Sequence, residues 1–203
     1  TAGKFGPFDG QLFFGDYTLS IIMRATTEKI NGVWQGACYP FREGLATGIM
    51  NIEFTPRGQL IVGGFTTNRQ WPVRGEAPFA IQRLDWNGKI PFELKEINIR
   101  PDGFLLTFTR PVERQVAGKP ETYAMTSYTH NFSAGYGSPE VDHTTPSVIR
   151  AEVSADGLQV RLRVEGIRES HIHDFDLAKV RGRDHKMLLH TRAYYTVNEI
   201  PLD

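Results

Sequence analysis

Short apolar segments separated by turn residues recur along the chain at intervals of about ten residues, and this spacing restricts the fold more than any other feature of the sequence. In residues 79–86 the side chains alternate between two faces, as they do in a strand. Residues 31–32 (Asn-Gly) and 56–58 (Pro-Arg-Gly) are typical of tight turns. No long segment repeats its apolar residues at the 3.6-residue spacing of a helix. The sequence therefore predicts an all-β protein.

The sequence predicts that the second half of the chain forms a separate domain. Residues 87–92 carry Gly and Pro as a connector does, so we expect a domain boundary near residue 94. The interval 128–146, rich in Gly, Ser, Pro and Thr, is expected to be one long loop. The expected strands of the first half are 11–16, 19–24, 33–39, 49–54, 59–64 and 79–86, and those of the second half are 96–100, 104–109, 147–153, 159–164, 171–177 and 194–200. These six strands in residues 95–203 come close to the seven of an immunoglobulin-like or fibronectin-like sandwich, which we expect here.

The charge balance gives no reason to expect nucleic acid or a membrane surface as a partner, and we expect neither. Basic and acidic residues number 23 each, so the formal net charge is zero, which is compatible with a neutral ligand. No apolar run approaches the length that crosses a bilayer. The single cysteine, Cys38, excludes an internal disulfide, and its apolar neighbours favour a buried, unreactive thiol.

The loop 66–78 is the main candidate for a ligand site, because it is longer than the usual connection within a hairpin. Guanidinium and amide groups can hydrogen-bond sugar hydroxyls or the carboxylates of a quinone, and an indole can stack on either ligand. The alternative is that these side chains pack and form salt links with Glu43 or Glu76. The candidate ligand-binding residues are Arg42, Glu43, Asn68, Arg69, Trp71 and Arg74.

Two further groups of residues allow both a functional and a structural interpretation. His171 and His173 would share one face of a strand and are weak candidates for a metal edge, which needs a third ligand from elsewhere. Ordinary hydrogen-bonded histidines are the alternative. The tryptophans could form a platform for a polysaccharide together with Tyr17 and Tyr39. Trp34 and Trp86, however, lie in strand patterns, for which packing in the core is the usual explanation.

Several segments resemble the late blades of large secreted bacterial β-propellers. These propellers are similar to glucose and sorbosone dehydrogenases, which use pyrroloquinoline quinone, and they are often fused to cytochrome c modules. The resemblance covers nearly the whole chain. It rests on residues 4–13, 35–44, 68–71, 101–104, 136–140 and 194–195.

The resemblance implies that residues 1–94 are a propeller-blade-like β region of about six strands and that residues 95–203 form a sandwich cap. A whole propeller needs more blades, so the chain is expected to be the C-terminal part of a longer, periplasmic or extracellular protein. The dehydrogenase base and most cofactor contacts would then lie upstream, and no catalytic residue is transferred to this chain.

Two functions follow as expectations. The first is a C-terminal portion of a quinone-dependent sugar or alcohol dehydrogenase, whose partners are the sugar, a cytochrome c module and the upstream blades. The second is a non-catalytic module for carbohydrate binding or adhesion, whose partner is a sugar or polysaccharide. A structural spacer is the third and simplest alternative.

Overall fold

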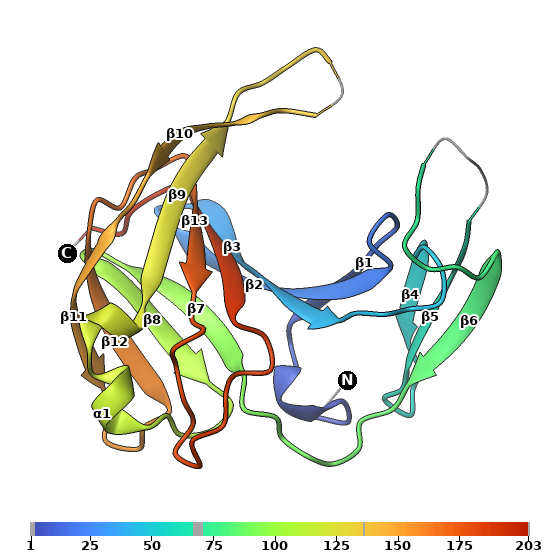
Figure 1. Ribbon diagram of the computed structural model, residues 1–203, viewed down its shortest axis with the longest axis horizontal. Helices are drawn as coiled ribbons and strands as arrows, with labels where there is room; N and C mark the ends of the chain where they lie inside the picture. Colours follow the sequence, from blue (N-terminus) through green and yellow to red (C-terminus); the bar gives the residue numbers. More distant parts are fainter. Residues whose placement is uncertain (1–2, 67–70, 136, 203) are drawn as a thin grey trace. The chain divides into compact units, whose positions relative to one another are not determined.

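The computed structural model describes residues 3–66, 71–135 and 137–202. It confirms the all-β class, since several antiparallel sheets are present and none closes into a barrel (Figure 1). The helices within these residues are short, namely η1 (Gly6–Phe8), α1 (Arg114–Ala117) and η2 (Pro120–Thr122). None of the helices described is long or apolar enough to span a membrane.

The chain divides into two compact units, each made of two segments, and their boundaries differ from the single domain boundary expected near residue 94. The first unit comprises Thr1–Ala25 and Cys38–Ile90, and the second comprises Thr26–Ala37 and Pro91–Asp203. Strands β2 (Ile21–Ile30) and β3 (Val33–Arg42) explain the difference, because each has ten residues and contributes to both units. The turn between them, Asn31-Gly32, has φ of 48° and 88°, as the expected tight hairpin requires.

The first unit is built from two sheet regions. Strand β1 (Leu12–Asp16) pairs antiparallel with β2, and β4 (Asn51–Phe54), β5 (Leu60–Phe65) and β6 (Phe79–Leu84) form a three-stranded sheet. One face of this sheet is apolar and buried because alternate side chains point to it. The buried residues of this core include Phe5, Ile22, Leu45, Ile49, Leu60 and Val62.

The second unit contains two antiparallel sheets with a shared core. One sheet has the order β11-β12-β8-β7 and the other continues from β3 through β14-β13-β9-β10. Phe104 joins them, because its ring lies 5.0 Å from that of Phe175 and 5.4 Å from that of Tyr195. The strands are β7 (Leu94–Arg100), β8 (Gly103–Phe108), β9 (Ala124–His130), β10 (Glu140–Thr144), β11 (Ser147–Val153), β12 (Gln159–Glu165), β13 (His171–Asp176) and β14 (Arg192–Val197).

The expectation of one loop over residues 128–146 is wrong. Strand β9 runs to His130, and β10 pairs with it from Glu140 to Thr144, with a shifted register between Val141 and Thr144. The polar composition hid this strand, because β10 is an edge strand held by backbone hydrogen bonds and only Val141 in it is apolar.

The expectation of buried tryptophans at two positions is also wrong. Trp34 lies within β3 but is 64% exposed, and the Lys29 ammonium lies 6.0 Å from the centre of its ring. Trp86 follows the end of β6 and is exposed as well, with Gly6 against its indole. Tyr39 is instead buried beneath the Arg24 guanidinium, so it is not part of an exposed platform.

Candidate functional site

The residues expected to bind a ligand lie in the first unit. Arg42 ends β3 and is exposed, as is Glu43. Asn68 and Arg69 lie outside the described residues. Trp71 and Arg74 are exposed, and the Arg74 backbone N–H donates to Thr18 O at 2.9 Å. A ligand contact for the six residues stays a prediction.

Cys38 also lies in this unit and is half-buried. Burial raises the pKa of its thiol, while a backbone hydrogen bond and the Arg24 charge oppose this effect. The group is therefore held as the neutral, weakly nucleophilic thiol.

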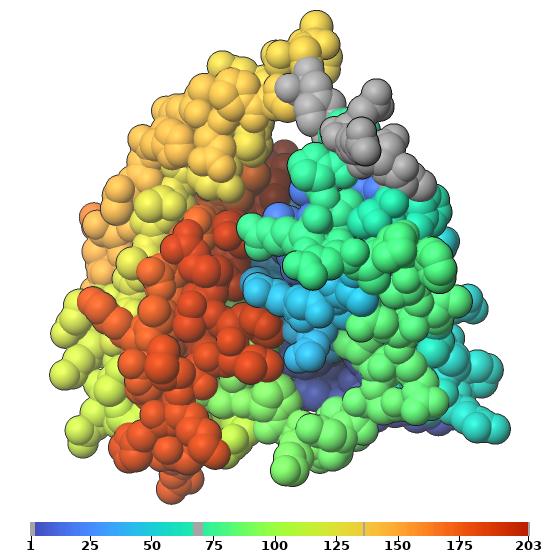
Figure 2. All heavy atoms as spheres, turned by 45° about the vertical axis from the view of Figure 1, so that its right-hand side comes forward, coloured from blue at the N-terminus to red at the C-terminus, as the bar shows by residue number. Residues whose placement is uncertain are grey.

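An exposed apolar surface covers the outer face of the three-stranded sheet in the first unit. Phe79 and Ile81 of β6 are 77% and 84% exposed, and Phe65 of β5 lies opposite Phe79. Gly63 lies opposite Ile81, and these four residues line a groove of about 740 Å³. Strand β6 is drawn in green in Figure 2. Surfaces of this kind are typical of contacts with another macromolecule.

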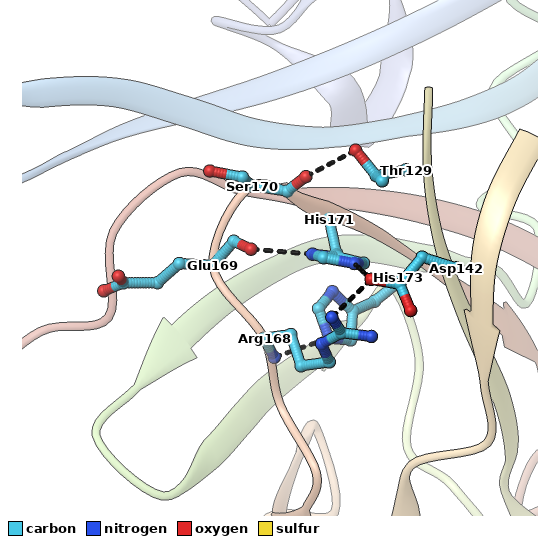
Figure 3. Close-up of polar contacts among 7 residues, drawn as sticks. All are labelled: Thr129, Asp142, Arg168, Glu169, Ser170, His171 and His173. Carbon is cyan, nitrogen blue, oxygen red and sulfur yellow. Dashed lines mark hydrogen bonds and ion pairs between the residues drawn. The ribbon is translucent and has the colours of Figure 1, made fainter. Parts of the chain in front are cut away.

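The expected histidine pair lies in the second unit, where His171 belongs to an ionic cluster (Figure 3). Its Nε2 lies 3.2 Å from Asp142 Oδ2 and its Nδ1 lies 2.7 Å from Glu169 O. Both partners are acceptors, so only the doubly protonated ring donates to both. Arg168 also donates to Asp142, and it is the main reason that the pKa of this carboxyl falls to about 2, with His171 adding to the effect.

His173 is held differently, although it is two residues away on the same face of β13. Its Nε2 accepts the Arg168 backbone N–H at 3.4 Å, so Nδ1 carries the proton in the neutral ring. Its ring packs 5.7 Å from that of Phe104. Burial lowers its pKa to about 4; a backbone hydrogen bond with His171 opposes this effect, and the charges of His171 and Arg168 add to it.

These contacts favour a structural role for the two histidines. Both nitrogens of His171 already have protein partners, and His173 faces the core of the sandwich. Within residues 3–66, 71–135 and 137–202, no three or more His, Cys, Asp or Glu side chains are grouped so that they could hold a metal ion.

The opposite face of β13 points out of the sandwich and carries the strongest candidate site. Alternation places Ile172, Asp174 and Asp176 on this face, while His173 and Phe175 point inward. The antiparallel register then sets three rows across the sheet: Tyr128–Ile172–Thr196, Thr126–Asp174–Tyr194 and Ala124–Asp176–Arg192. Carboxylates, an arginine and tyrosines therefore meet on one surface.

Asp174 is the unusual member of this surface. It is only 9% exposed, although it lies on the outward face. Its Oδ2 accepts from Arg192, whereas its Oδ1 is buried and has no hydrogen-bond partner among the described residues. Arg192 also lies 3.7 Å from Asp176. Burial raises the pKa of Asp174, Arg192 opposes the shift, and the charges of Asp176 and Glu140 add to it.

The other buried acidic residue of the described chain provides a contrast. Both carboxylate oxygens of Glu93 are paired, since Oε1 accepts from Leu94 N at 3.0 Å and Oε2 lies 2.7 Å from His190 Nδ1. Buried carboxylates are normally satisfied in this way, because an unpaired oxygen costs the free energy of removing it from water. The half-paired Asp174 is therefore the exception in this unit.

A groove of about 590 Å³ lies at Asp174. Strand β10 leaves β9 at Thr144, and the following residues 145–148 form part of the groove wall beside Ala124 and Thr126. The remaining lining residues are Pro120, Glu121, Tyr123, Met125, Asp174, Asp176 and Arg192.

Aromatic rings extend the same face toward the β9–β10 hairpin. The Tyr128 ring contacts both His130, at 5.5 Å, and His143, at 5.6 Å between ring centres. Burial, followed by the charges of Glu140 and Asp174, raises the pKa of the Tyr128 hydroxyl, so it is a neutral hydrogen-bonding group. The surface thus combines polar groups that can bind hydroxyls with rings that can contact an apolar ring face.

Comparison with known proteins finds no matching family model, no significantly similar curated protein and no significantly similar solved structure. The resemblance to quinone-dependent dehydrogenase propellers therefore stays a prediction. The same holds for the quinone, the cytochrome partner, the upstream blades and the periplasmic or extracellular location.

Proposed function

We propose that the second unit is a non-catalytic binding module for sugars, and that it holds them in the groove at Asp174. The observation that carries this proposal is Asp174, which lines a groove large enough for a small ligand and whose buried Oδ1 has no hydrogen-bond partner among the described residues. A sugar hydroxyl that donates to Oδ1 would remove the cost of leaving this oxygen unpaired.

The neighbouring groups suit the same class of ligand. Arg192 supplies further donors beside the carboxylate, and Asp176 supplies acceptors. Tyr194 lies next to Asp174 across the sheet, and Tyr128 lies one row further. Pairs of polar groups beside aromatic rings are typical of sites that bind sugars through their hydroxyls and their apolar faces.

A binding function without catalysis is favoured by the state of the acidic groups. Asp174 and Asp176 are both tied to Arg192. The nearest histidines on this face, His130 and His143, contact the Tyr128 ring rather than the two aspartates. Nothing in the groove pairs a nucleophile with a base within hydrogen-bond distance among the described residues, as group transfer would need.

The test is ligand-observed NMR with a panel of neutral soluble oligosaccharides built from glucose, mannose, galactose or xylose. We expect saturation transfer from the native protein to at least one of them at about millimolar concentration. Replacing Asp174 by Asn should weaken the transfer, because the amide cannot both accept from Arg192 and offer a free carboxylate oxygen.

The matched control is Asp85→Asn, which changes a carboxylate that is also paired with an arginine, Arg83, but lies in the first unit. It should leave binding unchanged. Binding as tight with Asp174→Asn as with the native protein would contradict the site, and no binding of any sugar would contradict the function.

A further inference from the structure

Acidic side chains outnumber basic ones around the groove. Glu121, Asp174 and Asp176 line it, and among the described lining residues Arg192 is the one Lys or Arg. Both aspartates interact with this single guanidinium. The arginine therefore neutralises at most one of the three carboxylates.

The charged groups just outside the groove do not change the sign of its net charge, which is negative. Burial is the main cause of the raised pKa of Asp174, and the charge of Glu140 adds a little to it. Lys179 adds one positive charge, since its Nζ donates to Glu121 O at 3.2 Å. Three of these carboxylates and one of these cations line the groove, so a ligand that enters it meets an excess of negative charge.

The free acceptor on Asp174 has the same preference. Its Oδ1 is buried, and in such a place a hydrogen bond from a charged donor is stronger than one from a neutral hydroxyl. An ammonium group carries three donors and one positive charge, so it can satisfy Oδ1 and offset the excess charge together. A carboxylate on the ligand would instead be repelled by Asp174, Asp176 and Glu121.

We infer that the ligand of this groove is an amino sugar, a glycan unit that carries a free ammonium group, in preference to neutral and acidic sugars. This inference rests on the proposed sugar-binding function. It assigns Asp174 as the acceptor for the ammonium group, and Arg192 and Asp176 as the groups that orient the neighbouring hydroxyls.

The experiment compares three trisaccharides of one linkage type by isothermal titration. They are β-1,4-linked glucosamine, β-1,4-linked glucose and β-1,4-linked mannuronic acid, used at about pH 6, where the sugar amine is protonated. One charge-assisted hydrogen bond predicts that the glucosamine trimer binds about tenfold more tightly than the glucose trimer. The mannuronic acid trimer should bind more weakly than both.

Three controls test the cause of this preference. It should shrink as salt rises, since part of it is electrostatic. It should also vanish at about pH 9, where the sugar amine is neutral. Asp174→Asn should bring the glucosamine and glucose trimers to similar affinities, while Asp85→Asn should keep the difference.

The outcomes separate the inference from the function beneath it. Equal binding of the glucosamine and glucose trimers by the native protein would overturn the amino-sugar inference and leave sugar binding standing. Preference for the mannuronic acid trimer would overturn it as well. Failure of all three trimers and of the neutral panel would overturn both.

Discussion

Acidification should destabilise the second unit through His173. The pKa of this residue falls from the ordinary 6.5 to about 4 because its ring is buried. The folded protein therefore favours the neutral ring, and the stabilisation is complete above 6.5 and lost as the pH falls through 6.5 toward 4. A pKa shift of this size lowers the unfolding free energy by about 3 kcal/mol below both pKa values and by about 2.5 kcal/mol at about pH 4.5.

The variant that isolates this effect is His173→Phe, which keeps an aromatic ring beside Phe104 and removes the titration. It also removes the acceptor of the Arg168 N–H, so its stability at neutral pH is lower. The informative quantity is the change with pH. Between about pH 7.5 and about pH 4.5 the native protein should lose about 2.5 kcal/mol more unfolding free energy than the variant.

The assay is urea unfolding followed by the backbone amide NMR signals of β12, β13 and β14, because the chain has two compact units and the signal must come from the second. His185→Asn serves as the control, since His185 is exposed and its φ of 61° suits asparagine. It should follow the native protein. Equal losses in native protein and His173→Phe, or an NMR titration of the His173 ring with a midpoint near its ordinary value, would refute the argument.

Three further predictions follow from other contacts. The pKa of Asp142 is lowered to about 2, so its ionised carboxylate stabilises the fold above pH 3.8 and loses this contribution as the pH falls toward 2. Asp142→Asn should therefore reduce the loss of β10 stability at acidic pH, measured by amide exchange. Asp174 has a raised pKa, so its ionisation costs stability as the pH rises through the pKa of the folded state. The melting temperature of Asp174→Asn relative to that of the native protein should therefore increase with pH. A difference that stays constant with pH would contradict this. Ile81→Thr on the exposed outer face of β6 should change the unfolding free energy by less than about 0.5 kcal/mol in urea denaturation, whereas a larger loss would place this side chain in a core.

The sequence predicted those strands whose side chains alternate between water and the core. Strand β11 has the predicted bounds, and β12 differs from its prediction by one residue at its end, because the turn residues 155–157 separate two alternating segments. Strand β2 extends six residues beyond its prediction, through residues 25–30, of which 26–29 are polar. It continues because backbone pairing with β3 does not require apolar side chains.

Less of the candidate site could be predicted, because its parts meet only through pairing between strands. Asp174 and Arg192 are 18 residues apart in sequence, and they meet because the register of β13 and β14 places Asp176 opposite Arg192. The pair Glu93 and His190 is separated by 97 residues. Spacing in the sequence carries no signal for such contacts, since it shows which face a side chain takes but not which strand lies beside it.

Neighbouring positions on β13 show how far a pattern can lead. The alternation in residues 171–176 assigns His173 to one face and Asp174 to the other, and the structure agrees. By that pattern alone the outward aspartate is an ordinary solvated carboxylate and the inward histidine is a candidate ligand. The surroundings reverse these roles: His173 is neutral and packed against Phe104, and Asp174 is 9% exposed with one oxygen unpaired. A fold tolerates such an oxygen at a cost, and a binding role for this groove is the physical reason that we give for keeping it.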